Sequence, residues 1–265
     1  PTGNHGVLSP SLSLSGDGST LAVSSKTIED LNSGYEVKSV LIYKNLSGTW
    51  TKTGTISRPY SQSASEDLES FGYELNLSFD GSVLAVGDPF DESFNGSVSV
   101  FQDINGTWNQ IGNKLTGQDV NDLGNFFGQQ LQLSADGTEL IIGVGKGVYL
   151  GSRDTGAIGE AKIYQNLNGT WVEIEAFLTG ESPTDLVGSS VSISADGSVL
   201  AVGASLTDGS GIDSGHVRVY VKNSAGGWQP VGGDIDGESA GDYFGGRVSL
   251  SADGSVLAVS AENNS

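Results

Sequence analysis

Short apolar runs recur along this chain at a regular spacing, each set beside a polar turn. Residues 248–251 alternate, which places apolar side chains on one face of a strand and serines on the other. An Asp-Gly pair follows, which favours a tight hairpin turn. A nearly continuous apolar run comes next, as in residues 198–203, and indicates a strand buried on both faces. A third strand alternates over residues 217–220, and a polar turn leads to a fourth that starts at a tryptophan. The pattern predicts units of four antiparallel strands, without helical periodicity.

This unit is repeated. Residues 12–23 return in similar form at 75–86, 131–142, 191–202 and 248–259, so that the turn glycine falls at positions 18, 81, 137, 197 and 254. The four tryptophans share one register, at Trp50, Trp108, Trp171 and Trp228. Radial arrays of four-stranded sheets have this signature. We therefore expect an all-β chain with the β-propeller fold and four-stranded antiparallel blades, as one domain over residues 1–265. The repeats span residues 7–70, 71–126, 127–186, 187–243 and, in part, 244–265.

The number of blades is left open by the sequence. The chain holds about 4.5 repeats, whereas a closed ring of five such units needs roughly 295 residues and a ring of seven roughly 410. Two interpretations remain. The chain is a fragment of a larger ring, such as a seven-bladed one, or a ring closed with an incomplete blade. Because an open strand edge invites aggregation, the first is favoured.

Composition excludes several classes of function. There is no cysteine, so disulfides and thiolate metal sites are absent. The net charge of −20 repels nucleic acid and anionic membranes. No run of 18 apolar residues exists, so we expect no insertion into a membrane. The two histidines, His5 and His216, suggest neither a Ser-His-Asp triad nor a zinc site.

The repeat resembles a known family. Its residues 187–204 and 244–260 carry the pattern Phe/Val-Gly, an alternating strand, Asp-Gly-Ser and Leu-Ala-Val, and a Gly-x-Val-x-Val-Tyr segment follows in the complete repeats. This is similar to the FG-GAP repeats found in the propeller of integrin α-subunits. The resemblance implies a propeller used for adhesion or ligand recognition outside the cell, either secreted or on the cell surface, and not an enzyme.

A calcium site is predicted in a different place from the family's own. The calcium-binding members carry several acids between the first two strands, but each such turn here has one aspartate, too few for calcium. The loop over residues 234–242 has acids at its positions 1, 3, 5 and 9, which are Asp234, Asp236, Glu238 and Asp242. That spacing lets a short loop wrap one Ca²⁺. The alternative is a solvated acidic rim.

Other recurring residues have structural and functional interpretations side by side. The Asp-Gly pairs and the tryptophans are expected to be structural, as turn residues and as packing posts between blades. Asn-x-Ser/Thr sequons predict glycosylation of a secreted chain, while the same residues are also common in turns. The predicted acceptors are Asn45, Asn95, Asn105 and Asn168.

The binding surface is predicted in the loops that follow each second strand, because these gather on one face of a propeller. They cover residues 25–38, 88–96, 144–159 and 205–215, and within them Tyr35, Phe90, Tyr149 and Arg153 are the candidate contacts. We expect a noncatalytic module that binds protein or glycan. One alternative is a structural subunit that meets further blades or neighbouring subunits. The other is a propeller enzyme acting on polysaccharide, for which carboxylates lining a central channel would be the sign.

Overall fold

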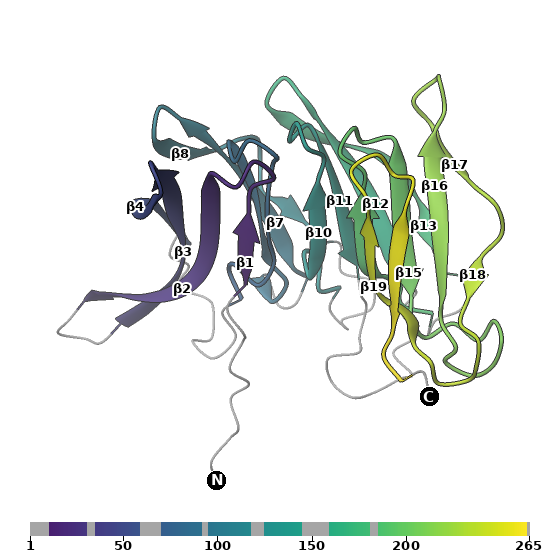
Figure 1. The fold of residues 1–265 in the computed structure, drawn as a ribbon. Coiled ribbons are helices and arrows are strands. Elements are labelled where there is room, and N and C mark those ends of the chain that lie inside the picture. Colours follow the sequence, from purple (N-terminus) through teal and green to yellow (C-terminus); the bar gives the residue numbers. More distant parts are fainter. Residues whose placement is uncertain are drawn as a thin grey trace, which may run out of the picture.

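The computed structural model describes residues 11–30, 35–58, 70–91, 95–117, 125–144, 159–180 and 185–263. This part of the chain is all β, and its strands pair antiparallel in five successive sheets. The first sheet has the order β1 (Leu12–Leu14), β2 (Thr20–Asp30), β3 (Tyr35–Leu46) and β4 (Thr49–Ser57). Figure 1 shows the sheets following one another in chain order along a curved row that does not close into a ring in the described part.

The second, third and fourth sheets keep the same strand order. The second contains β5 (Leu75–Leu77), β6 (Val83–Asp88), β7 (Ser97–Ile104), β8 (Thr107–Gln110) and, beside β7, β9 (Leu115–Thr116). The third contains β10 (Gln130–Leu133), β11 (Glu139–Val144), β12 (Glu160–Leu167) and β13 (Thr170–Thr179). The fourth contains β14 (Val187–Ile193), β15 (Val199–Ala204), β16 (His216–Lys222), β17 (Trp228–Pro230) and, beside β16, β18 (Ile235–Asp236). The fifth has two strands, β19 (Phe244–Leu250) and β20 (Leu257–Ala261).

The hydrophobic core lies between neighbouring sheets. Apolar side chains of the first and second sheets form one cluster, those of the second and third a further cluster, and those of the third and fourth another. Leu131 and Leu133 of β10 are each 5% exposed in this arrangement, whereas Leu12 and Leu14 at the same repeat position of β1 are 68% and 53% exposed. No described sheet covers that face of the first sheet.

The tryptophans fill the outer parts of these interfaces. Trp171 is 7% exposed between the second and third sheets, and Trp108 and Trp228 pack against the clusters of the sheets before them. Trp50, in the first sheet, is 43% exposed. The packing role predicted from the shared register is therefore confirmed for three of the four.

The aspartates of the Asp-Gly turns are structural, as predicted. In the third sheet, Ser134 Oγ donates to Asp136 Oδ1 at 2.6 Å, and Thr138 N donates to the same oxygen at 3.0 Å. Gly137 follows with a φ of +69°, which favours glycine. The same serine-to-aspartate bond recurs in all five turns. Hydrogen bonds hold the carboxylate in its charged form, and those from Ser251 and Ser255 lower the pKa of Asp253 to about 2.

Backbone hydrogen bonds join these turns from sheet to sheet. The bonds run from Asp17 N to Phe79 O (2.9 Å), Phe79 N to Ala135 O (2.8 Å), Ala135 N to Ala195 O (2.9 Å) and Ala195 N to Ala252 O (2.8 Å). Each sheet is thus fixed to the next at one edge by main-chain atoms as well as by side-chain packing.

The recurring glycines allow the sheets to approach closely. A Cβ placed on Gly143, in the second strand of the third sheet, would lie 2.1 Å from the carbonyl oxygen of Gly188 in the fourth sheet. Gly188 has a φ of +84°, in the region that other residues rarely adopt. The glycine of the second strand and the glycine of the Phe/Val-Gly pair are therefore required by the same contact.

Candidate functional site

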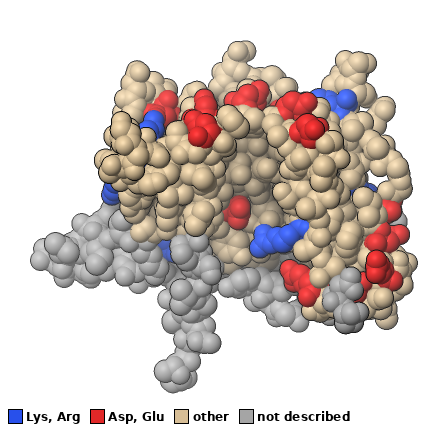
Figure 2. Space-filling view, viewed as in Figure 1, with Lys and Arg blue, Asp and Glu red and all other residues tan. Residues whose placement is uncertain are grey.

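The candidate site lies on the first strands of the sheets, at the position where each strand begins. Figure 2 shows this face hollowed near its middle, with a basic side chain at the border of the hollow and an acidic side chain within it. Three long polar residues occupy the equivalent position of three repeats: Glu74 before β5, Gln130 in β10 and Arg247 in β19. The first and fourth repeats carry Ser11 and Ser190 there.

Gln130 and Arg247 meet across an intervening sheet. Arg247 Nη1 donates a hydrogen bond to Gln130 Oε1 at 3.3 Å, although the residues are 117 positions apart and belong to the third and fifth sheets. Side chains from non-adjacent sheets reach each other only where the sheets curve around them. The hydrogen bond therefore places these two side chains on the concave side of the row.

Glu74 interacts with the positive charge of Arg247, and its side chain is partly buried. Its partial burial favours the neutral acid, while the positive charge of Arg247 opposes that effect. Burial dominates, and the pKa of Glu74 rises from 4.5 to about 7. A carboxyl group with such a pKa exchanges a proton readily at neutral pH, which is what a general acid or base requires.

The arrangement combines two capabilities. Glu74 can take a proton from water or return one, and Arg247 can stabilise an oxygen that becomes negative during a reaction. Gln130 holds the guanidinium through its side-chain oxygen. Sequence reasoning missed all three, because Glu74 and Arg247 are far apart along the chain. The sequence does contain a signal for two of them, because Glu74 and Arg247 occupy a position that is serine or glutamine in the other repeats.

Other charged side chains form ion pairs between neighbouring sheets. Arg58, at the end of the first sheet, binds Asp88 (3.0 Å) and Asp91 (2.7 Å), and Lys114 binds Asp91 (2.8 Å). Burial raises the pKa of Asp88 in spite of Arg58. Burial also acts to raise the pKa of Asp91, but hydrogen bonds from Lys114 and Ser97 outweigh it and the pKa is lowered. Because these charged groups are paired with one another, we interpret them as structural ion pairs that hold the first two sheets together.

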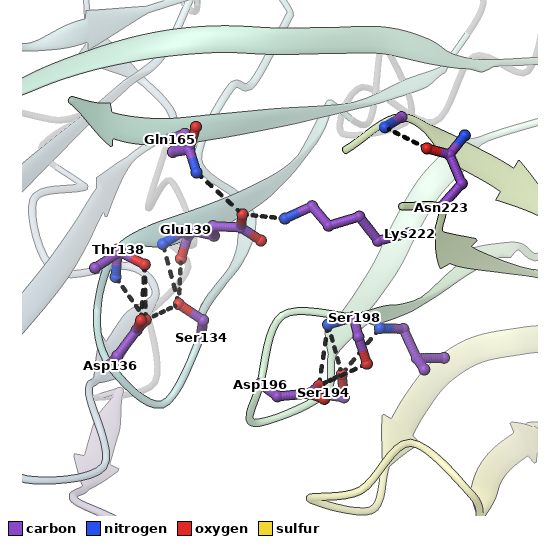
Figure 3. Close-up of polar contacts among 12 residues, drawn as sticks. Ser134, Asp136, Thr138, Glu139, Gln165, Ser194, Asp196, Ser198, Lys222 and Asn223 are labelled. Atoms are coloured by element: carbon purple, nitrogen blue, oxygen red, sulfur yellow. Dashed lines mark hydrogen bonds and ion pairs between the residues drawn. The ribbon is translucent and has the colours of Figure 1, made fainter. Parts of the chain in front are cut away.

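A second buried ion pair joins the third and fourth sheets (Figure 3). Lys222, at the end of β16, binds Glu139 Oε1 at the start of β11, and the Glu139 side chain is 7% exposed. Gln165 donates to the same oxygen at 3.4 Å. Glu139 N donates to Ser134 Oγ at 3.0 Å, which connects the pair to the adjacent Asp-Gly turn. The Lys222 ammonium also lies 5.2 Å from the ring centre of Trp228.

The structure does not gather the predicted calcium ligands around one point. The prediction used Asp234, Asp236, Glu238 and Asp242. Asp234 accepts two hydrogen bonds from Arg218, at 2.6 and 2.8 Å, while Asp242 is buried and accepts one from Ser239 N at 2.8 Å. Within the described ranges, no three His, Cys, Asp or Glu side chains are grouped so that they could hold a metal ion. Calcium binding at this loop remains a prediction without a preformed ligand cluster.

Of the four residues predicted as contacts on the loop face, Phe90 is the one whose side chain the structure describes. Phe90 is not a surface residue, which corrects that prediction. It is 8% exposed, because its ring packs between those of Tyr73 (6.1 Å) and Phe126 (5.9 Å). Tyr35 begins β3, and its side chain lies outside the described part. Tyr149 and Arg153 also lie outside the described residues.

The predicted glycan acceptors lie in two settings. Asn105 and Asn168 are exposed in the turns before the fourth strands, and Asn45 is exposed near the end of β3. Asn45 Oδ1 accepts a hydrogen bond from Gly48 N at 2.8 Å, which is the role of a turn residue. Asn95 is half-buried, and its side-chain oxygen is fully covered. Glycosylation at these residues remains a prediction.

Comparison with known proteins supports the fold. No protein family model and no curated protein sequence matches the chain. Among solved structures, the periplasmic gluconolactonase PpgL of Pseudomonas aeruginosa has a TM-score of 0.52 at 18% identity, over 96% of this chain and 63% of its own. A functionally unknown protein from Desulfotomaculum acetoxidans DSM 771 has a TM-score of 0.56 at 15% identity, over 96% of this chain and 65% of its own. The chain thus spans less than two thirds of the length of each.

The predicted β-propeller fold is confirmed as a class, because the described sheets are antiparallel and PpgL shares their arrangement. Membership of the FG-GAP family is not shown. The expectation of a noncatalytic chain needs correction, because the neighbours that share its fold include PpgL, a protein named as an enzyme. No helix in the described ranges has the length and apolar character needed to cross a membrane.

Proposed function

We propose that this chain forms part of a propeller hydrolase that opens a sugar-derived lactone on the concave side of the row of sheets, with Glu74 as general base. The proposal rests on Glu74, Gln130 and Arg247, which share one repeat position in three sheets. Arg247 is hydrogen-bonded to Gln130, and its charge acts on Glu74. It follows the alternative of a propeller enzyme rather than that of an adhesion module, with a lactone as substrate in place of the polysaccharide expected from the sequence. The substrate class is suggested by the name of PpgL, and it is proposed here for the chain on the chemistry of the site.

The residues present suit hydrolysis of a lactone. The Glu74 carboxylate takes a proton from water while the water oxygen bonds to the lactone carbonyl carbon. The carbonyl oxygen becomes negative in the tetrahedral intermediate, and Arg247 stabilises it. The bond between that carbon and the ring oxygen then breaks, and protonated Glu74 returns its proton to the leaving oxygen. The products are a carboxylic acid and a hydroxyl group, so one water is consumed and Glu74 is regenerated.

Charge favours a neutral substrate. The chain has 32 acidic and 12 basic residues, so its field repels anions on approach. Glu74, when ionised, neutralises part of the charge of Arg247. An uncharged lactone meets neither difficulty, and its acidic product is repelled once formed. This supports an unphosphorylated lactone as the substrate.

The finer features of the fold belong to the same proposal. We infer that each complete sheet corresponds to one blade, so that the chain supplies four blades and the first two strands of a fifth. The strand orders of the first four sheets support this assignment. A location outside the cytoplasm, secreted or at the cell surface, also remains a proposal. The periplasmic location in the name of PpgL is consistent with it.

The test is hydrolysis of D-gluconolactone by the purified chain, followed with a pH indicator and corrected for the spontaneous rate. Glu74→Gln is expected to lower kcat by about 10²–10⁴-fold, the range for loss of a general base. Arg247→Gln is expected to lower it by about 10²–10³-fold, as for an oxyanion donor. Glu238→Gln, a change at an exposed carboxylate in the loop over residues 234–242, is the matched control.

The pH profile separates catalysis from folding. For a general base with a pKa of about 7, the rate rises with pH through that value. Circular dichroism of each variant establishes that it is folded. A wild-type rate no higher than the spontaneous one, or a folded Glu74→Gln variant with unchanged kcat, would refute the proposal.

A further inference from the structure

The first strand of each described sheet is an edge strand, so its outer N–H groups have no strand of the same sheet beside them. At every step along the row, a polar side chain of the preceding sheet accepts one of these N–H groups. The bonds run from Leu77 N to Ser13 Oγ (2.9 Å), Leu133 N to Asn76 Oδ1 (2.9 Å), Ile193 N to Gln132 Oε1 (2.9 Å) and Leu250 N to Ser192 Oγ (3.0 Å). We call the four accepting residues the edge ladder.

The edge ladder needs only an accepting oxygen, and a serine hydroxyl supplies it in the first and fourth sheets. The second and third sheets carry asparagine and glutamine at the same position. Asn76 and Gln132 therefore depart from the repeat, as Glu74 does. Besides their length, they differ from serine in the side-chain NH₂ group, which has two hydrogen-bond donors.

The protein itself does not use these two NH₂ groups. The oxygen of each amide is bound in the edge ladder, whereas the nitrogen has no hydrogen-bond partner among the residues that the structure describes. Both side chains are half-buried. Neither nitrogen is among the fully covered side-chain atoms that lack a partner. Asn76 Nδ2 and Gln132 Nε2 are therefore accessible to water or to a ligand, on amides that the edge ladder holds in place.

The two amides lie close to the proposed reacting groups. Glu74 continues the course of β5, because its carbonyl oxygen accepts a hydrogen bond from Gly87 N at 2.9 Å. Side chains alternate along a strand, so Asn76 shares a face with Glu74. Gln132 is related to Gln130 in the same way. Two residues along a strand span roughly 6.6 Å, a distance that a six-membered lactone with its hydroxyl groups can bridge.

We propose that Asn76 and Gln132 bind the hydroxyl groups of a neutral six-membered sugar lactone, by donating from Nδ2 and Nε2 to the hydroxyl oxygens. The inference rests on the proposed function and adds to it the residues that distinguish a hydroxylated ring from a bare one. A site that hydrogen-bonds a hydroxyl group discriminates against an analogue without it, because the donors then lose their partner.

The test compares D-gluconolactone with δ-valerolactone, a six-membered lactone without hydroxyl groups. The double variant Asn76→Ser/Gln132→Ser keeps the kind of oxygen that the edge ladder has in other sheets and removes both NH₂ groups. Each lost hydrogen bond is expected to weaken binding about 3–10-fold. The value of kcat/KM for D-gluconolactone should therefore fall about 10–100-fold, mainly through KM, whereas that for δ-valerolactone should stay the same.

The control is Ser13→Ala, which removes a bond of the edge ladder and no NH₂ group. It is expected to lower the melting temperature and to leave the ratio of the two kcat/KM values unchanged. In the double variant, an equal fall for both lactones or an unchanged ratio overturns the inference.

Circular dichroism establishes whether the double variant folds. If it does not, Asn76→Asp/Gln132→Glu replaces it, because each carboxylate keeps the accepting oxygen and lacks the two donors. The substrate is then D-gluconolactone with all its hydroxyl groups methylated, since an ether oxygen accepts hydrogen bonds and donates none. The same fall in kcat/KM is expected, and an unchanged value overturns the inference.

A binding measurement separates this inference from the proposed hydrolysis. Methyl β-D-glucopyranoside has a hydroxylated six-membered ring but no carbonyl, and its binding to the wild type and the double variant is followed by saturation-transfer NMR. If neither lactone is hydrolysed, the proposed function fails and this measurement decides the inference. Binding to the wild type that is lost in the double variant supports it, whereas equal binding to both, or none to the wild type, overturns it.

Discussion

Two leucines at the same position of different repeats are expected to respond very differently to truncation. Leu131 in β10 and Leu12 in β1 occupy equivalent sites, but Leu131 is 5% exposed and Leu12 is 68% exposed. Leu131 belongs to the cluster between the second and third sheets, where Val83 and Val98 lie across the interface. The substitutions Leu131→Ala and Leu12→Ala therefore remove the same atoms from opposite environments.

The magnitudes follow from burial. Truncating a leucine in a packed core costs about 2–5 kcal/mol, because the loss of transfer energy is joined by the cost of a cavity. For Leu12, about a third of the side chain is covered, and full burial of a leucine stabilises by roughly 1.5–3 kcal/mol. Its truncation is therefore expected to lower the free energy of unfolding by about 0.5–1 kcal/mol at most, without a cavity.

Urea denaturation followed by tryptophan fluorescence measures both values. Trp171 lies in the same cluster as Leu131 and reports on that interface. Because sheets in a row can unfold in parts, the slope with denaturant must be the same in the two variants before their free energies are compared. Equal losses of stability in the two variants would refute the reasoning. They would mean that the face of the first sheet is covered in solution as fully as the interfaces between sheets.

Two further predictions concern buried charge. Lys222→Met leaves the Glu139 carboxylate, 7% exposed, without its cation, and is expected to cost about 3–5 kcal/mol. The double variant Lys222→Met/Glu139→Gln should recover most of this in urea denaturation, and a single variant as stable as the wild type would contradict the assignment. The raised pKa of Glu74, about 7 against 4.5 when unfolded, means that the folded state binds more protons than the unfolded state between these values. The free energy of unfolding should therefore fall as pH rises from about 4.5 to about 7, and Glu74→Gln should remove that part of the pH dependence, whereas an unchanged dependence in the variant would contradict the pKa.

The sequence predicted those features that depend on neighbouring residues and on the repeat. The Asp-Gly turns form because Asp136 caps the turn and Gly137 adopts a positive φ, and both requirements are local. The tryptophans pack as predicted because their register recurs, and the exception, Trp50, depends on whether a sheet lies against it. Periodicity thus gives the strands and their order, because the fold repeats a short-range pattern.

The candidate site escaped prediction because it depends on curvature. Gln130 and Arg247 meet only because the third, fourth and fifth sheets bend around them, and no short-range pattern states how far a row of sheets bends. Phe90 was misjudged for a related reason. It lies in a loop, where exposure is the usual expectation, but Tyr73 and Phe126 enclose it. The residues that depart from the repeat, such as Glu74, are the better guide to function than those that recur.

The backbone bonds that join the Asp-Gly turns couple each sheet directly to its neighbours in the row. Ala135 donates to the turn on one side and accepts from the turn on the other, whereas Asp17 donates onward to Phe79 at the start of the series. The second, third and fourth sheets are therefore each held by main-chain atoms at two turns, once by the sheet before and once by the sheet after. A displacement of one of these sheets strains its bonds to both neighbours, so the adjacent sheets are the first to respond to a local change. The third sheet, which carries Gln130, is held in this way on both sides, and it supplies the reference against which Arg247 is positioned.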